Sequence, residues 1–68
     1  MSPTPAEIRA ARKAAGLTQA RAAELAMYGA PERWTEIESG TRRIDRARWA
    51  LFRLRAKLVT LHQLNTES

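Results

Sequence analysis

Arginine is the side chain with the clearest chemistry in this chain of 68 residues. Lys and Arg number 12 against 7 Asp and Glu, which gives a net charge of +5, and only Lys13 and Lys57 are lysines. The planar guanidinium group forms paired hydrogen bonds with phosphate and with guanine, so the excess of arginine indicates a nucleic acid as partner. A choice for solubility or a GC-rich genome would give the same composition.

The other reactive residue types do not form a catalytic or metal-binding group. The chain has no cysteine, His62 is its single histidine, and its glutamates are distributed singly. No glycine-rich phosphate loop is present. We therefore expect no enzyme, no metal and no cofactor, and we interpret His62 as a solvent-facing helix residue.

Length and hydropathy limit the chain to one small domain. Its 68 residues, 44% of them hydrophobic, allow a core near the minimum that folds alone. No apolar run approaches ~18 residues, and residues 1–5 lack the basic and apolar segments of a signal peptide. The sequence thus predicts a cytoplasmic protein with no membrane partner.

Capping signals predict the first helices. Thr4 is a helix N-cap followed by Pro5 at the first helical position, and this helix should run to about Ala15. Gly16 can take the left-handed conformation that closes it. Thr18 is a second N-cap, so a second helix should begin directly after it.

The second and third helices are predicted to enclose a tight turn. The second helix should cover residues 19–26, and residues 27–30 form the turn, in which Gly29 is the expected residue with positive φ. Pro31 then begins a third helix that Gly40 closes. This order of short helices and turn is typical of a helix-turn-helix.

A longer helix follows. Asp45 can cap it, and the pattern predicts it over residues 46–64, with room for one further helical turn around Ile44. Residues 1–4 are expected to form an N-terminal tail and residues 65–68 a frayed C-terminal tail.

The last helix is apolar on two opposite faces. At 100° per residue, one stripe comprises Ala47, Ala50, Leu51, Leu54, Leu58 and Leu61. The other stripe comprises Trp49, Phe52, Ala56 and Val59. One stripe should close the core and the other should contact a second copy of the chain, unless the chain itself wraps the helix on both sides. The candidates for a dimer interface are Leu54, Leu58, Leu61, Phe52 and Val59.

The order of these motifs resembles the Cro/CI-type (XRE) helix-turn-helix family of phage and bacterial regulators. The matching residues are Arg9 to Arg12, Leu17-Thr18-Gln19, Ala23-Glu24, and Ile37-Glu38-Ser39-Gly40 followed by basic residues. Residues 31–34 and 47–51 are similar to small single-domain regulators of phages or mobile elements. The resemblance covers about residues 6–55. It implies an all-α fold, a compact four- to five-helix lambda-repressor-like domain over residues 5–64 that ends in a dimerisation helix.

The resemblance also implies roles for particular residues. Arg12 and Glu38 match a largely buried ion pair between the first and third helices, which fixes geometry more than it adds stability. The third helix matches the recognition helix that lies in the major groove. Its base-reading positions hold Pro31, Glu32 and Glu36, flanked by Arg33 and Thr35.

Contacts to the DNA backbone are implied on both sides of that helix. Gln19 matches a family glutamine that contacts the backbone and fixes neighbouring side chains, and with Thr18 it lies where helix N–H groups can bind phosphate. Tyr28 projects from the turn, either toward a phosphate or into the core. The basic residues that match phosphate contacts after the third helix are Arg42, Arg43 and Arg46.

The chain departs from the family pattern at three points. The turn before Pro31 is one residue longer than usual, and Ala30 replaces a polar N-cap, a loss of ~1 kcal/mol. The third departure is that Glu32 and Glu36 put two carboxylates among the base-reading positions. Either they accept hydrogen bonds from cytosine in a G·C-rich operator, or they hold Arg33 while it reads guanine, or this helix faces a protein.

We therefore expect a sequence-specific DNA-binding transcription regulator. It should be a repressor of its own operon that binds an inverted repeat as a homodimer, with helix 31–39 in the major groove and no small-molecule effector. The alternative is a protein-binding module, an antitoxin or inhibitor that reuses the helix-turn-helix fold.

Overall fold

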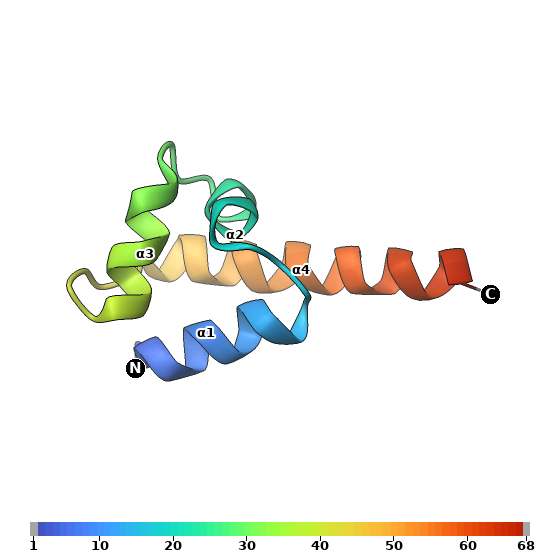
Figure 1. Ribbon diagram of the computed structural model, residues 1–68, viewed down its shortest axis with the longest axis horizontal. Coiled ribbons are helices and arrows are strands. Elements are labelled where there is room, and N and C mark those ends of the chain that lie inside the picture. Colours follow the sequence, from blue (N-terminus) through green and yellow to red (C-terminus); the bar gives the residue numbers. More distant parts are fainter. Residues whose placement is uncertain (1, 68) are drawn as a thin grey trace.

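The computed structural model describes residues 2–67, and the side chains of residues 2–62. The described residues form helices and no strand, which confirms the predicted all-α fold. Three short helices precede one long helix, and Figure 1 shows the short helices gathered beside the N-terminal part of the long one. They are α1 (Pro5–Ala14), α2 (Gln19–Leu25), α3 (Pro31–Ser39) and α4 (Arg46–Glu67).

Side-chain oxygens begin three of the helices, as the sequence predicted. Thr4, Thr18 and Asp45 each accept a hydrogen bond of 3.1 Å from the backbone N–H three residues further along. Helix α3 begins at Pro31, and the N-cap residue before it, Ala30, makes no side-chain hydrogen bond to the helix. The start of α3 therefore depends on proline and on packing more than on capping.

The first three helices end in the same left-handed turn. Gly16, Met27 and Gly40 have φ values of 69°, 65° and 86°. Each donates its N–H back into the last turn of its helix, and so does the residue that follows it. The prediction of Gly29 as the residue with positive φ is wrong, because Leu25 is the last residue of α2 and the closing geometry then falls on Met27.

The long helix differs from its prediction at both ends. No helical turn forms at Ile44, whose side chain is buried instead in a non-helical segment. Helix α4 continues through Glu67, three residues past the predicted end at Leu64, because neither glycine nor proline occurs there to stop it.

The core forms where α1, α2 and α3 meet the N-terminal part of α4. Its large, fully buried side chains are Trp34, Phe52, Ile8 and Ile37. The Phe52 ring lies 4.8 Å from that of Trp34 and 5.7 Å from that of Trp49, measured between centroids. The alanines of α2 let this short helix approach the aromatic rings closely.

Phe52 and Val59 were predicted among the candidates for a dimer interface, and this is wrong for Phe52. Phe52 is 0% exposed, and Val59 is half-buried against the same core. The stripe that contains them closes the domain because the aromatic rings of α3 and α4 pack together there. The opposite stripe of α4 remains on the surface.

Candidate nucleic-acid interface

Helix α3 presents a polar face to solvent and an apolar face to the core. Glu32, Arg33 and Thr35 are exposed and Glu36 is half-buried, whereas Trp34 and Ile37 are fully buried. The 3.6-residue period of the helix separates the two faces. The predicted base-reading side chains of α3 thus lie on one accessible surface.

Glu36 bridges two arginines on this surface. Its Oε1 atom lies 3.4 Å from Nη1 of Arg33 and 3.3 Å from Nε of Arg42. All three side chains are between a third and a half exposed, so these ion pairs orient the arginines and add little to stability. The pairing of Arg42 with α3 is a contact that the sequence pattern did not predict, because it joins residues from a helix and a loop.

The loop from Gly40 to Asp45 carries the next basic residues. The backbone N–H groups of Thr41 and Arg42 donate to the Glu36 carbonyl at 2.9 and 3.2 Å, which folds the loop back on α3. Arg43 and Arg46 are exposed, and no hydrogen bond or ion pair occupies their side chains within the described part of the chain. They are available to an external anion.

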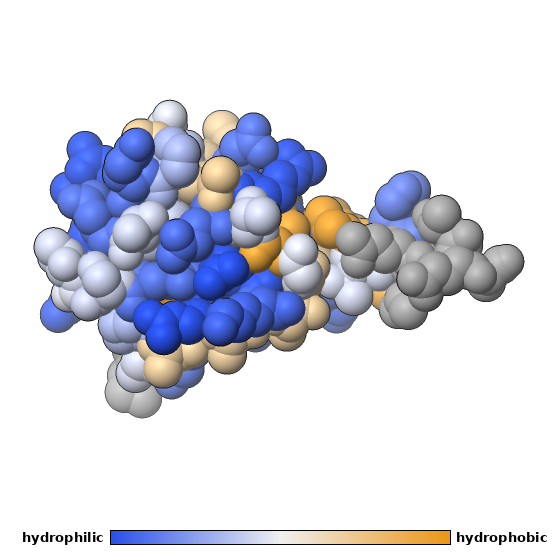
Figure 2. All heavy atoms as spheres, viewed as in Figure 1, coloured by the Kyte–Doolittle hydropathy of each residue, from blue (hydrophilic) through white to orange (hydrophobic). Residues whose placement is uncertain are grey.

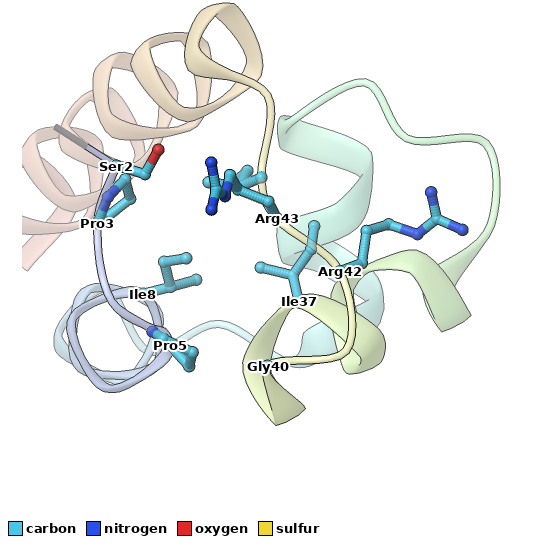
Figure 3. Close-up of a pocket in the computed structure, with 9 residues that line it drawn as sticks. Ser2, Pro3, Pro5, Ile8, Ile37, Gly40, Arg42 and Arg43 are labelled. Carbon is cyan, nitrogen blue, oxygen red and sulfur yellow. The ribbon is translucent and has the colours of Figure 1, made fainter.

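A hollow of about 430 Å³ lies between this loop and the N-terminal segment. Ile8, Ile37 and Ile44 form its apolar floor. Figure 3 shows Arg43 turned toward Ser2 at its rim, whereas Arg42 points away from it. The two consecutive arginines therefore extend in different directions from the same loop.

A buried carboxylate joins α1 to α3. Glu38 is 4% exposed, and its Oε2 atom lies 2.6 Å from Nε of Arg12, while Oε1 accepts from Arg12 Nη2 at 3.2 Å. The Trp34 indole N–H also donates to Oε2, and Arg9 lies 3.6 Å from Oε1. The structure thus brings together Arg12 and Glu38, the two residues of the expected ion pair.

The electrostatics of Glu38 follow from these contacts. Burial by itself raises the pKa of Glu38, but hydrogen bonds from Arg12, Trp34 and Gln19 outweigh this effect and hold the pKa below its ordinary value. The group is therefore an anion at neutral pH. Fully partnered and inaccessible, it acts as a structural anchor.

Gln19 connects that anchor to the exposed surface. Its Nε2 donates to Glu38 Oε1 at 3.2 Å, and its Oε1 accepts from the Thr35 hydroxyl at 3.3 Å. The first residue of α2 is thereby fixed against the middle of α3. The side chain of Thr18, which precedes it, is used as the cap of α2.

Tyr28 lies at the turn after α2 and is half-buried. It was expected either to contact a phosphate or to fill the core. Its hydroxyl accepts from the Asp45 N–H at 3.3 Å, and the Arg48 guanidinium lies 4.9 Å from its ring centroid. The ring packs against the core. These contacts favour the core-filling role of Tyr28. They also place the basic residue Arg48 beside the turn, a neighbour that the sequence pattern did not predict.

The surface over these helices is hydrophilic in character. Figure 2 shows polar residues covering most of the visible face of α1, α2 and α3. Over the residues that the structure describes, no helix has the length and apolarity to cross a membrane.

Comparisons of the chain with protein-family models, with curated proteins and with solved structures found no match.

Proposed function

We propose that this chain is a sequence-specific DNA-binding regulator of the Cro/CI helix-turn-helix type, with a lambda-repressor-like domain. In this proposal α2 crosses the phosphate backbone and the exposed face of α3 enters the major groove. The observation that carries it is the location of four arginines along one stretch of the chain: Arg33 on α3, Arg42 and Arg43 on the loop directly after it, and Arg46 at the start of α4. Such a cluster next to an exposed helix suits phosphate and base contacts.

In this arrangement Arg33 is the main base-reading residue. An arginine reads guanine through its O6 and N7 atoms, and the contact with Glu36 limits the directions that Arg33 can take. Glu32 and Thr35 lie beside it, where a carboxylate can accept from cytosine N4. We therefore infer a G·C-containing half-site, with Gln19 and the arginines of the loop fixing the register on the backbone.

The regulator acts as a homodimer on an inverted repeat. A domain of this size buries too little surface for specific binding alone, and two copies double the contact. A dimer bound across a promoter would exclude RNA polymerase, so the inferred outcome is repression, including that of its own operon. The protein needs no catalytic step and no cofactor for this role.

The second candidate is a protein-binding module of the antitoxin or inhibitor kind. Glu32 favours it, because an exposed carboxylate at the start of α3 is repelled by phosphates. Glu36 favours it less, since two arginines neutralise its charge. In that case α3 would contact a basic protein surface, and binding would weaken less steeply with salt than binding to DNA does.

Selection from a random duplex library at physiological salt tests the proposal. Recovery of an inverted repeat is the expected result, and recovery of no sequence by folded protein would refute sequence-specific DNA binding. Arg43→Ala should then weaken binding to all sequences about equally and lower the salt slope by ~1. Lys13→Ala is the matched control, because it removes the same charge from α1 outside the proposed contact surface.

A further inference from the structure

The surface stripe of α4 has the spacing of a coiled coil. Leu51, Leu54, Leu58 and Leu61, here called the leucine seam, are separated by three, four and three residues. Leu51 is half-buried, and the other three are 59%, 56% and 47% exposed. The core uses the opposite stripe of the helix, so Leu54, Leu58 and Leu61 stay largely uncovered by the described residues of this chain.

The charges of α4 are segregated along its length. All five of its lysines and arginines lie between Arg46 and Lys57, whereas residues 58–67 contain no lysine or arginine and one acid, Glu67. A parallel pair of such helices would place the two basic halves side by side. An antiparallel pair places Arg46, Arg48 and Arg53 against the half without lysine or arginine and leaves only Arg55 and Lys57 close to their copies. The helix dipoles also oppose each other favourably.

We propose that α4 pairs in antiparallel orientation with α4 of a second copy, through the leucine seam. One register places every leucine opposite another: Leu51 faces Leu61 of the second copy, and Leu54 faces Leu58. Because the spacings of the seam read the same in both directions, the pair has four leucine layers, two on each side of the dyad. The midpoint of this register lies at the level of residue 56.

The buried area sets the strength of this contact. In a pair, the exposed parts of Leu54, Leu58 and Leu61 from the two copies amount to roughly 600 Å² of apolar surface. This is about half of the ~1,200 Å² at the lower end of stable interfaces. The stems of flanking residues such as Lys57, which is exposed, must supply the rest. The dimer is therefore weak in free solution, forms at elevated protein concentration, and is strengthened when both copies bind one duplex.

The pairing also predicts how far apart the two DNA half-sites lie, and this prediction rests on the proposed function. Figure 1 shows α3 beside the N-terminal end of α4. Arg46 is ten residues from the midpoint, so at 1.5 Å per residue the two N-terminal ends lie about 30 Å apart along the common axis. The sideways offset of α3 adds to this distance, which gives half-sites separated by at least about one turn of B-DNA (~34 Å). A parallel pair would bring the two N-terminal ends together.

Single cysteines test the pairing directly, because the chain has none of its own. Leu51→Cys and Leu61→Cys proteins, one of them carrying a mass tag, are oxidised alone and as an equal mixture at ~100 µM without DNA. The antiparallel register brings position 51 next to position 61, but it separates the two copies of position 51 by about 15 Å along the axis, beyond the reach of a disulfide. The expected product is the mixed cross-link, at least tenfold over either homodimer.

Each other outcome overturns the proposal. Homodimeric cross-links in each protein alone would show parallel pairing, and no cross-link in folded protein would show that the seam does not pair with a second copy. Ala47→Cys with Asn65→Cys provides a second pair in case Leu51→Cys unfolds the domain, which circular dichroism detects. The same register places position 47 opposite position 65, and it separates two copies of either position by about 27 Å along the axis. Because the assay contains no DNA, its failure leaves the DNA-binding proposal standing, and a failed duplex selection leaves the pairing standing.

Discussion

Replacing Glu38 with glutamine should lower the free energy of unfolding by about 2–4 kcal/mol at neutral pH. The amide keeps the shape of the side chain and one acceptor oxygen. It removes the charge that balances Arg12, whose side chain is only 14% exposed. Breaking a buried ion pair costs ~3–5 kcal/mol, and the remaining hydrogen bonds of the glutamine recover part of this. A chain of this length has a total stability of roughly 3–10 kcal/mol, so the effect is large.

The effect of this substitution should depend on pH in one direction. The folded state holds the pKa of Glu38 below its ordinary value of 4.5. The stabilisation by the carboxylate is therefore fully present above the pKa of the unfolded chain, and it is lost as the pH falls through the folded-state pKa. Glutamine does not titrate. The stabilities of the wild type and the variant should thus converge in the acid range.

Urea unfolding, followed by circular dichroism at pH 7 and at about pH 3.5, measures both effects. Glu24→Gln is the matched control, because Glu24 makes an exposed ion pair of 2.9 Å with Arg21 whose loss should cost under ~1 kcal/mol. Equal losses for the two variants would refute the anchoring role of Glu38. A loss for Glu38→Gln that is the same at both pH values would refute the role of its charge.

The remaining predictions concern the left-handed turns and base reading. Met27→Gly should raise stability by about 0.5–1 kcal/mol, because Met27 is 59% exposed and has a φ of 65° that favours glycine. Gly16→Ala, at the equivalent turn after α1, should lower stability by about 1 kcal/mol because of the positive φ, although an added Cβ would meet nothing within 4 Å. Thermal unfolding measures the effects of both substitutions, and unchanged midpoints would contradict the assigned turns. Arg33→Ala should relax the base preference found by duplex selection, and an unchanged preference would rule out α3 as the reading helix.

The helices could be predicted because their boundaries depend on local interactions. Thr4, Thr18 and Asp45 bond to backbone groups only three residues away, and Gly16 and Gly40 supply the backbone freedom that a helix end requires. Such contacts depend only on a few consecutive residues. The end of α2 was harder to predict, because glycine is the usual left-handed residue and Gly29 lies two positions after the residue that takes this role.

The candidate surface was predictable in type but not in detail. The sequence indicated arginines around a third helix, and the family resemblance suggested that Arg12 and Glu38 pair. It did not indicate that Glu36 would hold Arg42, or that Gln19 would use both ends of its amide to join Glu38 to Thr35. These contacts join residues that only the packing of α2, α3 and the loop brings together.

The sequence by itself determined an all-α domain, its four helix starts and its excess of arginine, because propensity, capping and charge are properties of short segments. Only the tertiary structure decided the assignment of the two stripes of α4. Both are apolar at helical spacing, so periodicity could not separate them. Phe52 became core because the rings of Trp34 and Trp49 pack against it, and this packing left Leu54, Leu58 and Leu61 on the surface.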